Sequence, residues 1–364
     1  MPISSNLYLD LYVLQTVPPA NLNRGVDGSP KTAQFGGVTR TRVSSQSWKH
    51  AMRNYFADHD HPTTNRTTRI PQLLATELQA QNAGLSDDEA LELAETGLKA
   101  AGIKGITKQH TTKTLLSVTP AQLQAVARYL STCCLVNHTD PVKKDLQSLL
   151  LGDRTLDLEL FGRMVADNQE LTIDGAAQVA HALSVNAVEP EYDYFTAMDD
   201  QQPADQAGAF KIGEAEFNAP TLYRYANLNV RQLINDLGAD DALSGLAGFV
   251  KAFVLSMPTG KQHTYANKTL PSYIMATLRT DTPVNLVQAY EAPVPADDHG
   301  FVPTAIKRLD DMAAEAGKLT DTPLTTVTLD LTATHDTDAI NLADLIDQLT
   351  TDIKDVIANA DPNH

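Results

Sequence analysis

Basic and hydroxyl side chains gather in one short segment, residues 23–53, with a spacing suited to binding phosphate. A loop with the sequence NRGVDGSPK is followed by Gly36-Gly37 and then by RTRVSSQSWKHAMR. Glycine-containing loops of this kind present backbone N–H groups, hydroxyls and cations to an anion. The cations that could neutralise phosphates are Arg24, Lys31, Arg40, Arg42, Lys49 and Arg53, and the candidate hydrogen-bonding side chains are Ser44, Ser45 and Gln46.

The distribution of charge makes this segment unusual for its chain. The 364 residues carry a net charge of −17, which by itself argues against nonspecific nucleic-acid binding. Residues 1–70, however, hold eight of the 28 Lys and Arg residues and only four of the 45 Asp and Glu residues. We therefore expect a localised anion-binding surface on an otherwise acidic globular protein.

Enzyme and metal-site interpretations find weak support. Residues 257–262 contain Gly-Lys but lack the other groups of a phosphate-binding P-loop, and the patterns G-x-G-x-x-G and G-x-S-x-G do not occur. His59-Asp60-His61 could supply metal ligands, but a solvated loop is favoured, and we expect no metal and no cofactor. Asp27 could act as a general base on a ribose 2′-hydroxyl, although an Asp27-Gly28 turn is the commoner explanation.

Cations also alternate with aromatic residues in two later segments, as contacts to single-stranded nucleic acid require. These are Tyr223-Arg224-Tyr225-Ala226-Asn227 and Lys261-Gln262-His263-Thr264-Tyr265. Arg163-Met164 and Tyr194-Phe195-Thr196 place further apolar side chains beside polar loops. Packing in the core is an alternative for each, and for Tyr225 and Phe195 the two interpretations are about equally good.

Three further features suggest a cytoplasmic protein. Cys133 and Cys134 are adjacent, so they cannot connect distant segments, and buried thiols in a reducing compartment are expected. The N-terminus lacks the pattern of a secretory signal. No run of apolar residues approaches the ~18 needed to span a bilayer.

The basic segment is expected to lie between a strand and the helix that it enters. Residues 6–17 predict a strand, residues 20–43 a loop, and residues 45–57 a helix. On a helical wheel, Gln46, Lys49, His50 and Arg53 share one face, whereas Trp48, Ala51, Met52, Tyr55 and Phe56 occupy the other. One face can then pack on a sheet while the other faces a ligand.

The remaining pattern predicts an α+β protein with a helical insertion. Helices are expected over 73–81, 87–101, 120–134 and 141–151 in the insertion, and over 175–184, 230–237, 239–256 and 342–359. Strands are expected over 156–160, 192–195, 222–228, 273–280 and 284–290, and residues 189–218 predict a protruding polar loop. The basic stretch Lys104–Lys113 is interpreted as a solvated loop in preference to a binding site.

The order and spacing of these motifs resemble the CasC family, the backbone subunit of the type I-E CRISPR surveillance complex Cascade. N-R-x-x-x-G-x-P-K, G-G and R-x-R-x-S-S-Q-x-x-K-x-A-x-R carry the resemblance. Further matches extend over residues 6–290, at Gly162-Arg163-Met164, Ala180-His181-Ala182, Asp193-Tyr194-Phe195-Thr196-Ala197, Tyr223–Asn227 and Gly260-Lys261-Gln262. Where the family often has Arg after the lysine of the helix, this chain has His50, which weakens one phosphate contact at neutral pH.

The resemblance implies a right-hand architecture. An RRM-like (ferredoxin-like) palm would comprise residues 1–58, 166–188 and 219–364, with a helical fingers insertion at 59–165 and a thumb loop at 189–218. Copies would polymerise along a CRISPR guide RNA with other Cascade subunits, leaving the guide bases free to pair with target DNA. The matching palm residues Arg24, Lys31, Arg40, Arg42, Ser44, Gln46, Lys49 and Arg53 would contact phosphates and riboses, and Met164 and Phe195 would flank a displaced base.

This implied role is non-catalytic. Related type III backbone subunits cut target RNA with an aspartate in the corresponding loop, so a guide-dependent endoribonuclease that uses Asp27 is the alternative.

Overall fold

The computed structural model describes residues 6–59, 61–197, 211–332 and 340–359, with the backbone alone described at 211 and 212. The chain divides into two compact units. The larger unit comprises Met1–Tyr55 and Gln178–His364, and the smaller unit comprises Phe56–Ala177. The smaller unit therefore contains the expected insertion at 59–165 and adds residues 56–58 and 166–177, which were expected in the palm.

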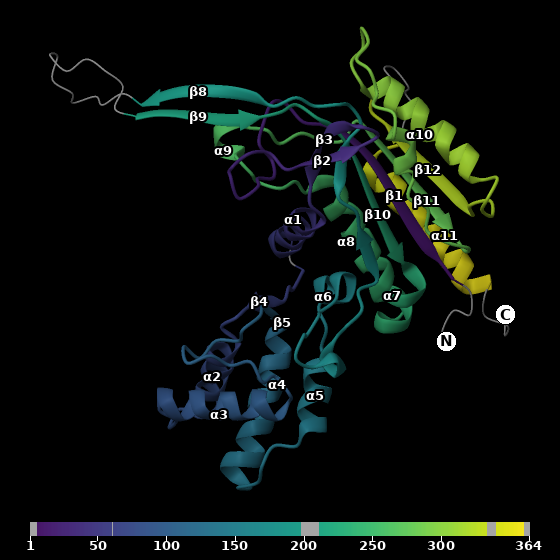
Figure 1. Ribbon diagram of the computed structural model, residues 1–364. Coiled ribbons are helices and arrows are strands. Elements are labelled where there is room, and N and C mark those ends of the chain that lie inside the picture. Colours follow the sequence, from purple (N-terminus) through teal and green to yellow (C-terminus); the bar gives the residue numbers. More distant parts are fainter. Residues whose placement is uncertain (1–5, 60, 198–210, 333–339, 360–364) are drawn as a thin grey trace, which may run out of the picture. The chain divides into compact units, whose positions relative to one another are not determined.

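An eight-stranded sheet forms the centre of the larger unit (Figure 1). The central strand β1 (Tyr8–Thr16) pairs antiparallel with β10 (Thr221–Asn229) and with β11 (Tyr273–Arg279). Beyond β11 the sheet ends at β12 (Thr325–Asp330). On the other side the order continues through β7 (Ala182–Ser184), β3 (Val38–Val43) and β2 (Thr32–Phe35), and β6 (Ala177–Val179) also pairs with β10.

Helices pack on this sheet, and its central strands are buried along almost their whole length. Seven of the nine residues of β1 are buried. Tyr12 and Leu14 of β1 belong to a core cluster with Ala305 and Leu309 of helix α10. The helices of this unit are α1 (Ser45–Asp58, whose last three residues belong to the smaller unit), α7 (Val230–Leu237), α8 (Ala239–Leu255), α9 (Gln262–Tyr265), η3 (Val287–Tyr290), α10 (Val302–Ala316) and α11 (Leu342–Asn359).

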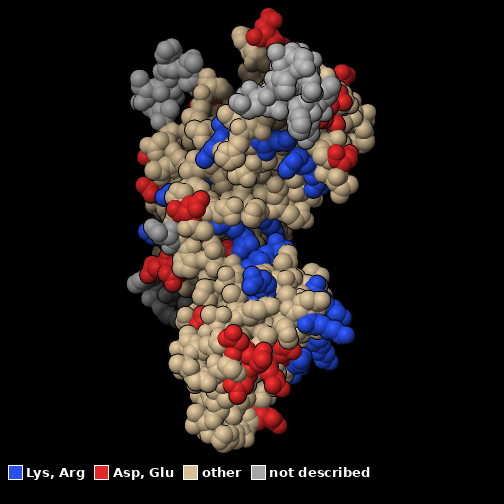
Figure 2. All heavy atoms as spheres, turned by 90° about the vertical axis from the view of Figure 1, so that its left-hand side faces the viewer, with Lys and Arg blue, Asp and Glu red and all other residues tan. Residues whose placement is uncertain are grey.

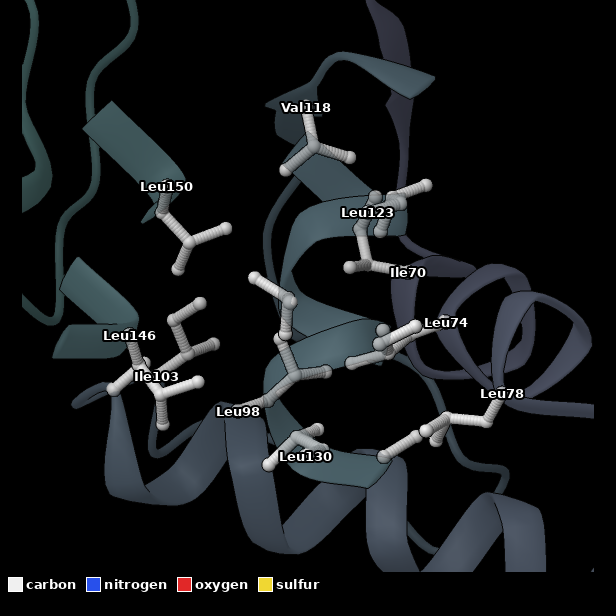
Figure 3. Packing of buried hydrophobic residues seen from close by; sticks show 14 of the residues in the cluster. Ile70, Leu74, Leu78, Leu98, Ile103, Val118, Leu123, Leu130, Leu146 and Leu150 are labelled. Carbon is white, nitrogen blue, oxygen red and sulfur yellow. The ribbon is translucent and has the colours of Figure 1, made fainter. Parts of the chain in front are cut away.

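The smaller unit is a helical bundle with its own core. Figure 3 shows its leucine and isoleucine side chains pointing toward one another, among them Leu74, Leu98, Leu130 and Leu146. Its elements are β4 (Asn65–Thr67), α2 (Ile70–Gln81), α3 (Asp87–Ala100), β5 (Leu116–Val118), α4 (Pro120–Leu130), the π-helical turn η1 (Ser131–Val136), α5 (Lys143–Leu151), α6 (Leu156–Phe161) and η2 (Gln169–Leu171). Capping boxes begin α3 and α4, where Ser86 and Thr119 accept hydrogen bonds from the backbone three residues later.

The predicted α+β class is confirmed, and so are the predicted elements that contain β1, β10, β11 and helices α1–α5, α7, α8 and α11, within a few residues. Four local predictions are wrong. Residues 156–160 form helix α6 instead of a strand, and 175–184 contain strands β6 and β7 instead of a helix. Residues 287–290 form the short helix η3, and the expected loop at 20–43 contains the hairpin of β2 and β3.

Within the expected loop at 189–218, the strand predicted over 192–195 is confirmed, and the rest is more regular than predicted. Strands β8 (Glu191–Ala197) and β9 (Lys211–Phe217) pair antiparallel from Glu191 with Phe217 to Ala197 with Lys211. They form a separate two-stranded sheet that projects from the larger unit (Figure 1). Residues 198–210, at the tip of the predicted thumb, lie outside the described residues.

Candidate nucleic-acid interface

The loop that begins the basic segment is held in shape by its own backbone. The N–H of Lys31 donates to the carbonyl of Asn23 at 2.7 Å, and the N–H of Gly25 donates to the carbonyl of Ser29 at 2.8 Å. Asp27 Oδ1 accepts the N–H of Ser29 at 3.1 Å. Gly28 has a φ of 91°, which favours glycine. The interpretation of Asp27-Gly28 as a turn is therefore confirmed.

Helix α1 begins directly at the end of β3, and its first turn is fixed by side chains. The Ser44 hydroxyl accepts the N–H of Ser47 at 3.3 Å and so acts as the N-cap. Asn23 Oδ1 in turn accepts the N–H of Ser44 at 3.0 Å, which joins the loop to the helix. Because Ser44 is only 6% exposed and its hydroxyl caps the helix, we remove it from the expected RNA contacts.

The two predicted faces of α1 are both present. Trp48, Ala51, Met52 and Phe56 are buried, whereas Gln46 is exposed. Lys49 and Arg53 on the polar face are half-buried, and burial lowers the pKa of Lys49.

We define the basic track as the accessible cations of this segment. Arg24 is exposed, and the other four members are half-buried: Lys31, Arg42, Lys49 and Arg53. The N–H of Arg42 donates to the Lys31 carbonyl at 2.8 Å, which places these two residues side by side. Figure 2 shows the face toward which the β8–β9 hairpin projects, with Lys and Arg side chains gathered across the part formed by the larger unit.

His181 lies beside the basic track; it belongs to the Ala180-His181-Ala182 match of the resemblance, but no RNA contact was expected of it. Its Nδ1 accepts the N–H of Ser45, the first residue of α1, at 3.1 Å and lies 3.4 Å from Arg42 Nη1. Partial burial, Arg42 and Lys31 lower the pKa of His181, in that order. The neutral ring therefore accepts at Nδ1 and carries its proton on the other nitrogen, so His181 adds a hydrogen-bond donor beside the cations.

The expectation that Arg40 contacts RNA is wrong. Its side chain is 0% exposed, and all five guanidinium N–H groups are used inside the protein. Nε donates to Phe35 O at 3.2 Å, and Nη1 donates to the carbonyls of Ser184 and Val185 at 3.0 and 2.7 Å. Nη2 donates to the carbonyls of Tyr290 and Glu291 at 2.8 and 3.1 Å. Arg40 therefore connects the β2–β3 hairpin to two distant segments of the larger unit.

Arg163 and Arg224 are likewise internal. Arg163 is 4% exposed and donates to the carbonyls of Leu171, Ser117 and Leu150 in the smaller unit, which corrects its expected role at RNA. Arg224 is 1% exposed and lies 3.7 Å from the ring centroid of Trp48 and 4.7 Å from that of Phe253.

The other members of the Tyr223–Asn227 segment are also buried, so their predicted stacking on bases is wrong and the packing alternative is correct. Tyr225, for example, donates to Asp10 Oδ1 at 2.7 Å within the sheet.

The apolar residues expected beside a displaced base are exposed. Met164 in the smaller unit is 81% exposed, and Phe195 in β8 is 44% exposed. A Cβ added to Gly213, which faces Phe195 across the hairpin, would lie 2.3 Å from the Phe195 ring. The Phe195 ring therefore occupies the space that a side chain at position 213 would fill. The core alternative for Phe195 is excluded by its exposure.

Lys261 lies beside the loop that begins the basic segment, because the backbone approaches that loop closely at the preceding residue. A Cβ on the preceding Gly260 would lie 2.1 Å from the carbonyl oxygen of Leu22, so only glycine fits there. Lys261 itself has a φ of 56° and is half-buried. The Gly-Lys pair that does not form a P-loop thus positions a cation beside residues 21–24.

The remaining candidates carry no site in the described part of the chain. Asp60 of the His59–His61 alternative lies outside it, and within it no group of three or more His, Cys, Asp and Glu residues could hold a metal ion. Cys133 is buried, and burial raises the pKa of Cys134 to about 12, so these thiols are poorly reactive. None of the described helices is long and apolar enough to cross a membrane.

The chain is similar to one protein family and to chains of known structure. The family model described as CT1975-like protein matches residues 9–357. A solved chain titled "CRISPR RNA-guided surveillance complex, pre-nicking" is 29% identical with a TM-score of 0.79, and the match covers 94% of this chain and 99% of that one. A second, titled "CRISPR RNA-guided surveillance complex", is 27% identical with a TM-score of 0.61, covering 94% and 98%. No curated protein matches the sequence.

Proposed function

Because the chain belongs to the CT1975-like protein family, we propose that it is a non-catalytic, RNA-binding backbone subunit of a Cascade-type CRISPR surveillance complex. In this proposal it is the CasC-like subunit of a type I-E complex in the cytoplasm. The larger unit is the RRM-like palm, the smaller unit is the fingers, and residues 189–218 are the thumb. The similar solved chains belong to RNA-guided surveillance complexes and match nearly the whole length of this chain, which supports the proposal.

The basic track is the observation that carries this function. Five accessible cations lie along one loop, one strand end and one helix face of a chain whose net charge is −17. Cations that neutralise successive phosphates bind the backbone of RNA without reading its bases. Guide bases would therefore remain free to pair with target DNA.

The β8–β9 hairpin supports assembly with further copies and other subunits. All seven residues of β8 are exposed, among them Tyr192, Tyr194 and Phe195. An isolated two-stranded hairpin is at best marginally stable in water. Large exposed aromatic side chains on such an element are typical of an interaction surface. We propose that the hairpin folds over the guide RNA bound by a neighbouring copy.

Co-expression with a CRISPR RNA tests the function directly. We expect a high-mass particle in which the RNA is protected from nuclease. In the variant Lys31→Ala with Arg42→Ala, RNA affinity should fall about equally for all sequences. The slope of log K against log salt should decrease by about 1.4, because each phosphate contact on a single strand contributes about 0.7. A loss restricted to one guide sequence would contradict backbone recognition.

A further inference from the structure

His181 lies where the strand part of the basic track meets its helix part. Strands β3 and β7 pair antiparallel through Val43 and Ala182, so the residue before Ala182 lies beside the end of β3. Arg42 is the cation of the track on the strand side of this junction. Lys49 is the first cation on the helix side, four residues and therefore about 6 Å beyond the start of α1. His181 thus lies between cations on two different elements.

Two donors determine the position of the proton on the His181 ring. Nδ1 accepts the backbone N–H of Ser45 at 3.1 Å, and Arg42 Nη1 lies 3.4 Å from the same nitrogen. A ring nitrogen that accepts a hydrogen bond carries no proton, so the proton is on Nε2. Partial burial and the neighbouring cations lower the pKa of His181, which keeps the ring neutral at pH 7.

The Nε2–H group of His181 is available to a ligand. The residue is exposed. Within the described part of the chain its hydrogen-bond contacts are the two at Nδ1. The two nitrogen atoms of an imidazole ring point in different directions, so these contacts leave Nε2–H unoccupied. His181 therefore offers one uncharged donor among the cations of the basic track.

An uncharged donor suits a ribose better than a phosphate. A phosphate is bound most strongly by a cation, and Arg42 and Lys31 already supply cations beside the ring. His181 could add a charge only by protonating Nδ1, which would break its hydrogen bond with Ser45. In an RNA strand each ribose lies between two phosphates, and its 2′-hydroxyl oxygen is a neutral acceptor. A strand whose phosphates bind the cations on β3 and on α1 would therefore bring a ribose to His181.

We propose that the Nε2–H group of His181 donates a hydrogen bond to a ribose 2′-hydroxyl and so selects RNA over DNA at the basic track. The 2′-hydroxyl is the group by which a protein distinguishes the two nucleic acids. The contact involves no base, so it is compatible with guides of any sequence. His181 then determines specificity for the sugar, whereas the cations determine affinity for the phosphates. This inference rests on the proposed function.

Oligouridine and its 2′-fluoro analogue test this contact with the full-length protein. Fluorine at the 2′ position preserves the phosphates, the bases and the sugar pucker, but it is a poor hydrogen-bond acceptor. We expect the wild type to bind oligouridine about threefold or more tightly than the analogue, as for one hydrogen bond between neutral groups. In His181→Asn the amide oxygen can still accept the N–H of Ser45, but no donor reaches the place of Nε2. This variant should bring the affinity ratio toward one and melt within about 2 °C of the wild type.

Arg24→Gln is the matched control. Arg24 is an exposed cation of the basic track, and the hydrogen bonds of His181 within the described chain do not involve it. This variant should weaken the binding of both oligomers by the same factor, reduce the salt slope by about 0.7 and keep the wild-type affinity ratio.

Two results would overturn the assignment of His181 to the ribose. One is a wild-type protein that binds the two oligomers equally. The other is a wild-type ratio in His181→Asn, which is expected if Nε2–H contacts a phosphate or if the ring only supports the start of α1. Wild-type protein that binds neither oligomer would instead overturn the proposed function.

Discussion

Arg40 and Arg42 provide a sharp test of the distinction between an internal arginine and an RNA-binding one. They lie two residues apart on β3, yet Arg40 is 0% exposed and Arg42 is half-buried beside His181. We therefore predict that Arg40→Gln mainly lowers stability, whereas Arg42→Gln mainly lowers RNA affinity.

The magnitude follows from the five carbonyl groups that Arg40 satisfies. Each buried carbonyl left without a donor costs about 1–3 kcal/mol, although water and the new glutamine amide replace some of the lost contacts. Relief of the buried charge offsets a further part. We therefore expect a loss of about 3–5 kcal/mol. At about 2–4 °C per kcal/mol for a unit of this size, the melting temperature should fall by about 6–20 °C.

Thermal unfolding monitored by circular dichroism, together with RNA binding at several salt concentrations, measures both effects. Arg42→Gln should leave the melting temperature within about 2 °C of the wild type and reduce the salt slope by about 0.7. The reasoning fails if Arg40→Gln melts like the wild type, or if both variants lose the same amount of stability.

Three further outcomes are expected. Gly213→Val should displace the Phe195 ring and lower RNA affinity as much as Phe195→Ala does, with an unchanged circular dichroism spectrum; wild-type affinity would refute this. Asp281 accepts two hydrogen bonds from Arg279 at 3.0 Å, which lower the pKa of Asp281 to about 2. A depressed pKa adds stability above the unfolded value of 3.8 that is lost as pH falls through about 2, so Asp281→Asn should cost about 2 kcal/mol at pH 7 and little near pH 2 in denaturant titrations. RNA incubated with divalent metal should stay intact with both the wild type and Asp27→Asn; cleavage by the wild type alone would establish the endoribonuclease alternative.

Long periodic elements could be predicted from the sequence because local rules determine them. The amphipathic pattern of α1 and the capping boxes of α3 and α4 depend only on residues a few positions apart. These elements are present at nearly the predicted positions.

The short elements could not be predicted because distant residues decide them. The sequence Leu-Asp-Leu-Glu-Leu at 156–160 alternates like a half-exposed strand, but Asp157 and Glu159 are each 2% exposed within helix α6. Asp157 is satisfied by the N–H and hydroxyl of Thr64 at 3.0 and 2.7 Å, 93 residues away. A period-two pattern indicates a strand only when its polar residues face water.

Distant residues also decide which side chains of the candidate site are accessible. The motif predicted contacts for all cations of residues 24–53, and it could not separate the internal Arg40 from the accessible Arg42. What distinguishes them is the set of carbonyl acceptors 144, 145, 250 and 251 residues away from Arg40. The Ala180-His181-Ala182 match did not reveal the contact of His181 for the same reason, since its partner Ser45 is 136 residues distant.

The buried arginines should still add to the attraction of the proposed RNA ligand without touching it. Arg40 contacts carbonyl oxygens, and Arg224 contacts Gln15, a carbonyl and two aromatic rings. Among the described residues no carboxylate forms an ion pair with either of them. Burial lowers the pKa of Arg224 only to about 9, so its charge persists at neutral pH. An unneutralised charge in a medium of low dielectric constant acts over a longer range than one in water. Arg224 stacks directly beneath α1, and it therefore raises the positive potential at the basic track that the helix carries. The sequence motif therefore overestimates the number of accessible cations, because Arg40 is internal, although the charge of Arg40 still adds to the positive potential of the larger unit.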